Sequence, residues 1–137
     1  MSPDPVEELV RGVAARKLPP LVYQVLPRPR YLLVRYSGRV ETGEIARSWF
    51  RQLESLLLDH SVDQILWDSR PAKPHPAEVR TMIWDWLEGG RVLKRSAILV
   101  ESEMLRLSAN LSAVGGTLRL QAFHRFDEAE RWLSHPH

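Results

Sequence analysis

The chain carries the sequence GGTLRLQAFHRFDEAERWL at residues 115–133, and this stretch decides the fold. Its two leading glycines are typical of the end of a helix, and the alternating residues after them predict a strand. Asp127 stands where it can cap a short helix, in which Ala129, Trp132 and Leu133 recur at helical spacing. We expect this last strand and helix to seal a core and complete a domain.

Upstream of this stretch, strand patterns and helix patterns alternate along the chain. Residues 21–26 and 31–36 are rich in β-forming residues and predict an antiparallel hairpin. The other expected elements are a long amphipathic helix over residues 42–60, a buried strand at 62–68, a helix that ends at Gly89-Gly90, a core strand at 96–100 and a helix over 103–114. This order predicts an α/β fold, with a single mixed, mostly parallel sheet, an antiparallel first strand and helices on both faces.

A short helix is expected before the hairpin. Val6, Leu9, Val10 and Val13 fall on one helical face, and Pro19-Pro20 ends that segment. We therefore divide the chain into an N-terminal helical arm, residues 1–20, and an α/β domain, residues 21–137.

The composition bounds the function. A length of 137 residues fits one domain, and 19 basic against 17 acidic residues give a net charge of +2, which does not favour nucleic-acid binding. The chain has no cysteine, which excludes disulfides and cysteine zinc sites. No apolar run approaches the ~18 residues of a membrane span, so we expect a cytoplasmic protein without membrane insertion. An excess of arginine over lysine hints at a bacterial source.

No cofactor or metal motif is recognisable. The glycine pairs at 89–90 and 115–116 follow helices and lack the lysine and hydroxyl residue of a phosphate-binding loop. The other histidines do not form a metal cluster in the sequence; they are His60, His124, His135 and His137. We expect no cofactor, no metal and no catalytic residue.

Three segments resemble the SpoIIAA-like group of STAS-related domains: YLLVRYSGRV at 31–40 before a long helix, ILWD at 65–68 before a loop, and FDEAERWL at 126–133. This resemblance implies a mixed sheet and a regulatory, protein-binding role. In the sporulation anti-sigma-factor antagonists of that group, a serine at the start of the next helix is phosphorylated within an Asp-Ser-Ser-Gly motif. Residues 70–78 read RPAKPHPAE here, so the resemblance does not extend to that motif.

The loop after the buried strand is the best candidate surface. In open α/β sheets, partners meet the carboxyl ends of parallel strands, where helix amino termini favour anions. Asp68 and Ser69 begin the loop, and Arg70, Lys73 and His75 place positive groups beside the helix start. The alternative is structural: Asp68 caps the transition, the prolines set the turn, and the basic side chains face solvent.

Trp84 extends this surface along the next helix. The apolar face of that helix leaves Trp84 outside it, beside Arg80; the face comprises Val79, Met82, Ile83, Trp86 and Leu87. An exposed tryptophan is typical of an interaction anchor, whereas the structural alternative is that it covers the sheet edge or lies under the N-terminal arm. The predicted partner-binding set is Asp68, Ser69, Arg70, Lys73, His75, Arg80 and Trp84.

Three classes of function follow. The preferred one is a non-enzymatic regulatory or scaffold domain that binds another protein, alone or as a homodimer. The second is binding of a small apolar or anionic, lipid-like ligand, since the fold class is similar to CRAL-TRIO domains; its pocket would be lined by Trp49, Trp67, Met82 and Trp86. A small-residue face at Ser108 and Ser112 suits a close partner helix or the wall of a ligand pocket, and the structural alternative is ordinary packing. The third is an enzyme that uses Asp68, Ser69 and His75, which requires these side chains to lie within hydrogen-bond reach of one another. Trp67 lies inside an apolar strand and is expected to be buried.

Overall fold

The computed structural model describes residues 4–12, 16–18, 23–36, 38–104 and 119–135. Within them, six strands form one sheet in the order of the sequence. The first two pairings are antiparallel and the remaining three are parallel, which confirms the predicted fold class. The strands are β1 (Arg16–Leu18), β2 (Tyr23–Pro27), β3 (Leu32–Tyr36), β4 (Gln64–Asp68), β5 (Arg95–Leu99) and β6 (Leu120–Phe123). Of these, β1 is a strand that the sequence patterns did not predict.

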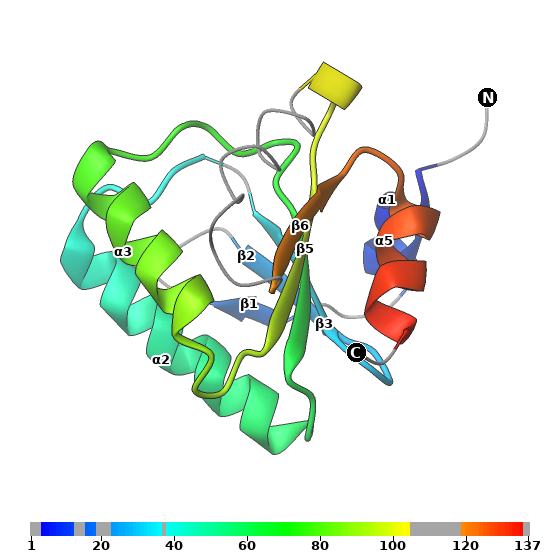
Figure 1. The fold of residues 1–137 in the computed structure, drawn as a ribbon, viewed down its shortest axis with the longest axis horizontal. Helices are drawn as coiled ribbons and strands as arrows, with labels where there is room; N and C mark the ends of the chain where they lie inside the picture. The colour runs from blue at the N-terminus through cyan, green and yellow to red at the C-terminus, as the bar shows by residue number, and fades with distance from the viewer. Residues whose placement is uncertain (1–3, 13–15, 19–22, 37, 105–118, 136–137) are drawn as a thin grey trace.

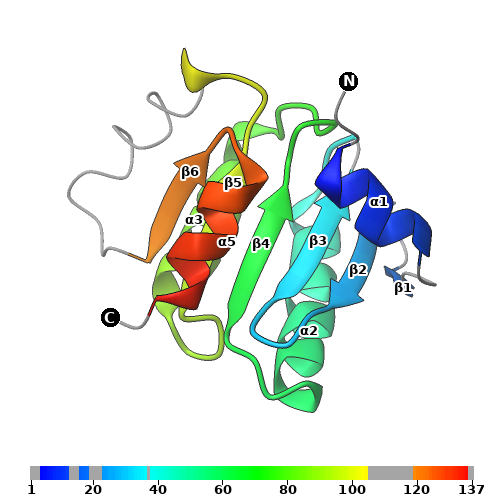
Figure 2. The ribbon, with the colours of Figure 1, turned by 90° about the vertical axis from the view of Figure 1, so that its right-hand side faces the viewer.

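Helices cover both faces of the sheet, as predicted. One face carries α2 (Gly43–Asp59) and α3 (Ala77–Gly89), and the other carries α1 (Pro5–Gly12) and α5 (Phe126–Ser134). Figures 1 and 2 show the two helical layers with the sheet between them. Strand alternation separates the two cores: Leu32 and Val34 belong to the core under α2 and α3, and Leu33 belongs to the core under α1 and α5.

The long helix α2 follows its sequence pattern closely. Thr42 is its N-cap, and the Thr42 hydroxyl accepts a hydrogen bond from the Ile45 N–H at 3.2 Å. One stripe of the helix is buried against the sheet and consists of Ala46, Trp49, Phe50, Leu53, Leu56 and Leu57. The neighbouring helix α3 ends at Gly89 and is followed by its C-cap Gly90, whose φ of 64° is the left-handed conformation that a glycine helix stop supplies.

The N-terminal helix α1 lies on the sheet. Val6 is inaccessible to solvent and shares a core with Leu26, Tyr31 and Leu33 of the hairpin. The hydroxyl of Tyr31 donates a hydrogen bond to Glu130 of α5. These contacts join the two ends of the described chain over one face of the sheet.

The cap of α5 differs from the prediction. Arg125 occupies the N-cap position, and Asp127 lies within the first turn, so the proposed Asp127 cap is wrong. The carboxylate of Asp127 instead lies 3.3 Å from Arg125 Nε and 3.5 Å from Arg131 Nη2. An acidic group in the first turn still opposes the positive end of the helix dipole.

The carboxyl end of α5 is held by side chains from the sheet. Gln64 donates to the Leu133 carbonyl at 3.0 Å, and Arg95 donates to the carbonyls of Trp132 at 2.7 Å and His135 at 2.8 Å. The guanidinium of Arg95 also lies 4.0 Å from the centre of the Trp132 ring. The last carbonyls of the helix therefore find donors inside the protein.

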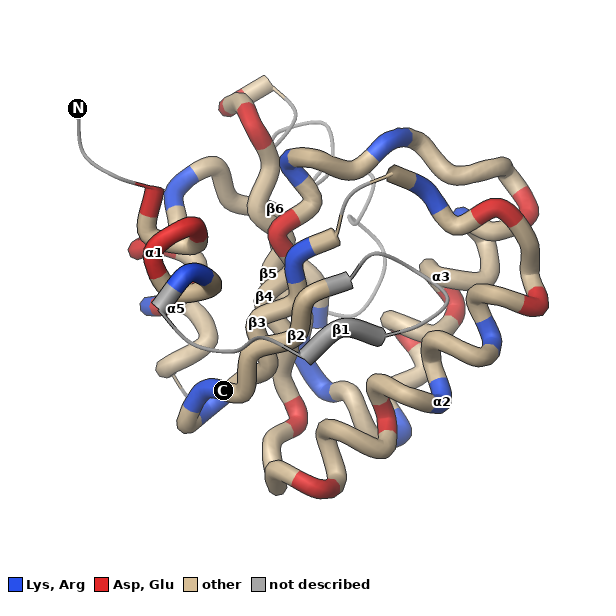
Figure 3. The backbone as a smooth tube through the Cα atoms, turned by 180° about the vertical axis from the view of Figure 1, so that it is seen from behind, with Lys and Arg blue, Asp and Glu red and all other residues tan. Residues whose placement is uncertain are grey.

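Two further expectations concern the rest of the chain. The predicted helix over residues 103–114, with Ser108 and Ser112, and the stop at Gly115-Gly116 fall mostly outside the described residues. In the described part, no helix combines the length and the apolar character that crossing a membrane requires. Figure 3 shows acidic and basic positions interspersed along α2 and α3, in keeping with the balanced composition.

Candidate functional site

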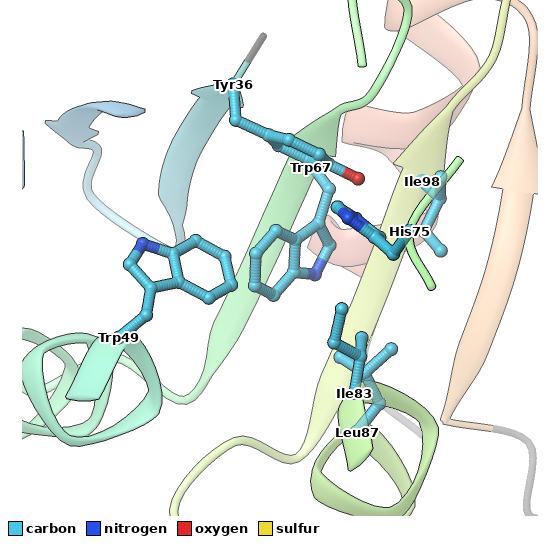
Figure 4. A pocket seen from close by; sticks show the side chains of 7 residues that line it. All are labelled: Tyr36, Trp49, Trp67, His75, Ile83, Leu87 and Ile98. Atoms are coloured by element: carbon cyan, nitrogen blue, oxygen red, sulfur yellow. The ribbon is translucent and has the colours of Figure 1, made fainter. Parts of the chain in front are cut away.

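A small pocket lies where the carboxyl halves of the central strands meet α2 and α3. Its cavity has a volume of about 50 Å³, and the described residues that line it are Tyr36, Trp49, Trp67, His75, Ile83, Leu87 and Ile98 (Figure 4). The sheet register explains the grouping, because Trp67 pairs with Ile98 on β5 and Tyr36 ends the neighbouring strand β3. All three point to the same face of the sheet.

Aromatic rings form much of the pocket wall. The ring centres of Trp49 and Trp67 are 5.1 Å apart, and Tyr36 meets the edge of Trp67 at 6.4 Å. Trp67 is 5% exposed, so the prediction that it is buried is confirmed. Offset and edge-on contacts of this kind are favourable because the edge of one ring meets the face of another.

His75 enters the pocket from the loop between β4 and α3. Its ring stacks on Tyr36 with centres 6.1 Å apart, and its Nδ1 accepts a hydrogen bond from the backbone N–H of Val40 at 2.9 Å. Burial, together with the charges of Arg39 and Arg80, lowers the pKa of His75. Because Nδ1 acts as an acceptor, the imidazole is neutral and its proton is on Nε2.

Two further polar groups face the same region. The buried indole Nε1 of Trp67 has no hydrogen-bond partner among the described residues. In Figure 4 this nitrogen lies on the side of the ring that faces Ile83 and Ile98, away from Trp49. Burial and the charge of Asp68 raise the pKa of Tyr36 to about 12, so its phenol keeps its proton near neutral pH. An unsatisfied buried donor costs about 1–3 kcal/mol, which makes the Trp67 N–H the most unusual feature of the pocket.

On the other side of the same loop, charged residues form an ion-pair cluster. Asp68 is 2% exposed, and its two carboxylate oxygens accept from Arg70 Nε at 2.7 Å and Nη2 at 3.0 Å. Arg70 also lies 2.9 Å from Asp4, just before α1. The hydrogen bond with Asp68 is the main reason that the pKa of Arg70 is raised, although burial acts in the opposite direction. Arg70 therefore links the loop to the N-terminal segment.

The loop is fixed to neighbouring strands at further points. The Ser69 hydroxyl donates to the Leu99 carbonyl at 2.9 Å, and the Lys73 N–H donates to the Gly38 carbonyl at 2.7 Å. The side chains of Lys73 and Arg80 are exposed, and Trp84 on α3 is half-buried. Trp84 is thus neither buried nor fully exposed, and neither core cluster of the described residues includes it, in keeping with its position outside the apolar face of the helix.

The structure separates the predicted site residues into three groups. Asp68, Ser69 and Arg70 are engaged in the loop and the ion-pair cluster, and His75 is the one predicted residue among those described that lines the pocket. The remaining three are Lys73 on the loop and Arg80 and Trp84 on α3; in the described part of the chain, no side-chain hydrogen bond or ion pair joins them to either group.

The pocket differs in part from the one expected. Trp49 and Trp67 line it as expected, whereas Met82 and Trp86 pack in the neighbouring core. The sequence patterns were not used to predict that Tyr36 lines the pocket. The alternation along β3 indicates it, because residues 32, 34 and 36 lie on the same face of the strand.

The arrangement required by the enzyme hypothesis is not assembled. Asp68 contacts Arg70, Ser69 donates to Leu99, and His75 Nδ1 accepts from Val40, so each of the three has its own partner. Among the described residues, no group of three or more His, Asp or Glu side chains could hold a metal ion.

Comparison with known proteins identifies the fold. No protein-family model and no curated protein matches the chain. An uncharacterized DUF3478-family protein from Shewanella loihica, described as SpoIIAA-like, is 18% identical with a TM-score of 0.61, over 88% of this chain and 99% of that chain. An anti-sigma factor antagonist from Mycobacterium paratuberculosis is 13% identical with a TM-score of 0.56, over 88% of this chain and 100% of that chain.

The anti-sigma factor antagonist SpoIIAA in its unphosphorylated form is 12% identical with a TM-score of 0.52, over 82% of this chain and 99% of that chain. At these identities the likeness establishes the fold, which is SpoIIAA-like. The resemblance noted in the sequence is therefore confirmed at the level of the fold.

Proposed function

We propose that the chain is a non-enzymatic regulatory domain that binds another protein at the carboxyl edge of its sheet. The contact surface consists of Lys73, Arg80 and Trp84, which we call the edge surface. The main observation behind this proposal is that hydrogen bonds and an ion pair hold the loop over residues 69–76 at several points. The exposed side chains of the loop are therefore attached to a fixed backbone.

A fixed loop favours binding because little conformational entropy is lost when a partner docks. The anchors are spread along the loop: Arg70 holds Asp68 and Asp4, Lys73 bonds to Gly38 through its backbone, and His75 accepts from Val40. The ammonium of Lys73 is left exposed by this arrangement, because only its backbone N–H is used.

The chemistry of the edge surface indicates the kind of partner. Lys73 and Arg80 are both cationic and exposed, so they favour an acidic partner surface and accelerate its encounter. Trp84 supplies a large, half-buried apolar group of the type that anchors protein interfaces.

The fold supports a regulatory role of this kind, since two of the similar proteins are described as anti-sigma factor antagonists. In this chain α3 begins after Pro76 with Ala77, so the helix start has no hydroxyl to phosphorylate. We propose that partner binding here does not depend on phosphorylation at that position, and that the domain acts in the cytoplasm, alone or as a homodimer.

The test compares two triple variants in co-purification from the native cell and then in calorimetry with the protein recovered. The first variant changes the edge surface: Lys73→Glu, Arg80→Glu and Trp84→Ala. The matched control changes two exposed arginines and an exposed leucine on α2: Arg47→Glu, Arg51→Glu and Leu58→Ala.

We expect the edge variant to lose the partner while its melting temperature falls only by the few degrees that the cost of about 1 kcal/mol for Trp84→Ala accounts for, and the control keeps the partner. Arg70 is left unchanged because it holds Asp68 and Asp4 together. Equal binding by both variants, or equal loss, would contradict the proposal.

A further inference from the structure

We propose that the aromatic pocket of Figure 4 is a binding site for a small uncharged molecule that carries a hydrogen-bond acceptor, such as a short ketone or amide. This site is separate from the edge surface, since the described residues that line the pocket include none of Lys73, Arg80 and Trp84. The inference therefore stands independently of the protein-binding proposal.

The first argument is the indole of Trp67. Its Nε1 is buried without a hydrogen-bond partner among the described residues, and its nitrogen faces Ile83 and Ile98 across the pocket. Most buried side-chain donors in folded proteins are paired with protein groups or with ordered water. An acceptor atom in the cavity would satisfy this donor.

The second argument is the protonation state of His75. Its Nδ1 is occupied by the Val40 N–H, so the neutral ring carries its proton on Nε2. His75 therefore carries a donor and no acceptor at its second nitrogen. With Trp67, this gives two N–H groups on residues that line one cavity.

The third argument concerns charge. The described residues that line the pocket are aromatic or aliphatic, and the one titratable imidazole among them is neutral. Arg39 and Arg80 act on His75, and Asp68 acts on Tyr36, so opposite charges lie around the site and neither sign lines it. A carboxylate would lose its hydration without gaining a cation inside the pocket. The ligand is therefore expected to be neutral, which narrows the apolar or anionic ligand predicted from the sequence.

The fourth argument is size. The cavity of about 50 Å³ is several times larger than the ~10–15 Å³ that a single water needs. It is much smaller than the roughly 300–1,000 Å³ of pockets that bury drug-sized ligands. A group of a few non-hydrogen atoms matches this volume, and a lipid chain does not.

Three probe molecules of nearly the same shape test the role of charge and the role of the hydrogen bond separately, by NMR on the wild-type protein. Acetone is neutral and has an acceptor, acetate is an anion with acceptors, and isobutene has the same shape without an acceptor. Each of the five tryptophans contributes one indole N–H signal, and Trp67→Phe identifies the signal of Trp67. We expect acetone to shift that signal saturably in the millimolar range, with acetate about tenfold weaker or not binding.

The controls use the same readout. Ile83→Phe narrows the cavity from α3 and should abolish the acetone shift, whereas Trp84→Phe on the same helix should leave the acetone affinity unchanged. Should Trp67→Phe fail to fold, standard backbone-to-indole assignment of the wild type identifies the signal.

Each alternative result overturns a stated part of the proposal. Absence of a saturable shift with all three probes would mean that the pocket holds only water. Acetate binding as tightly as acetone would overturn the inference of a neutral ligand, and isobutene binding as tightly would overturn the role of the hydrogen bond.

Discussion

Replacing Trp67 by alanine tests the packing of the pocket wall and the core beneath it. The side chain is 5% exposed and its ring contacts those of Trp49, Trp86 and Tyr36 at centre distances of 5.1, 6.1 and 6.4 Å. Removal of a buried tryptophan costs roughly 3–5 kcal/mol, and three ring contacts of about 0.5–1.5 kcal/mol each place Trp67→Ala near the upper end of that range.

Trp67→Phe is the informative companion. Phenylalanine keeps an aromatic ring in the cluster and removes the unpaired Nε1–H, whose burial costs about 1–3 kcal/mol. We therefore expect Trp67→Phe to lie within about 1–2 kcal/mol of the wild type. Trp84→Ala, at a half-buried position, serves as the matched tryptophan deletion and should cost about 1 kcal/mol.

Urea unfolding followed by far-ultraviolet circular dichroism measures all three variants, because tryptophan fluorescence would itself change with each substitution. Equal m-values are required for the comparison. The reasoning is refuted if Trp67→Ala costs no more than Trp84→Ala, or if Trp67→Phe costs as much as Trp67→Ala.

Three further variants test other contacts by the same unfolding measurement. Arg70→Met leaves the buried Asp68 carboxylate unpaired and should lower the free energy of unfolding by about 3 kcal/mol. A loss below ~1 kcal/mol would show instead that water solvates Asp68 when Arg70 is removed. Thr42→Ala removes the cap of α2 and should cost about 1 kcal/mol, and no loss would argue against the cap. Because the pKa of His75 is lowered on folding from 6.5, the unfolded chain binds its proton first as the pH falls, so the free energy of unfolding decreases as pH falls through about 6.5 and levels off below the folded pKa. His75→Gln retains an acceptor for Val40 and should remove this component, which lies below about pH 6.5; an unchanged pH profile would contradict it.

The elements with strong periodicity were the ones that could be predicted. The apolar stripe of α2 and the glycine stop of α3 depend on local sequence, and both match the structure. The strand β1 depends on pairing instead: its three residues show no alternation, and they are a strand because Arg16 and Leu18 pair with Val25 and Tyr23 of β2. Patterns within a segment do not report such a partner.

The candidate site shows the same difference between local sequence patterns and contacts of distant segments. Burial of Trp67 follows from its place in an apolar strand, and Trp84 lies outside the apolar face of its helix as the spacing indicated. The long-range partners of Arg70 and His75 could not be predicted, because Asp4 lies 66 residues from Arg70 and Val40 lies 35 residues from His75. The fold brings these pairs together. Arg70, which the sequence placed on the loop as a positive surface group, is therefore paired with the carboxylates of Asp68 and Asp4.

The layer formed by α1 and α5 has a consequence for the order of assembly during synthesis. Val6 and Leu133, from opposite ends of the described chain, belong to one core cluster. The ribosome releases residues in order at about 5–20 per second, so the apolar face of α1 emerges long before α5 can cover the sheet beside it. Most of the described residues of the opposite layer come from the middle of the chain, since α2 and α3 share a core with β3, β4 and β5. Co-translational folding should therefore complete the α2 and α3 side first and close the α1 and α5 side last.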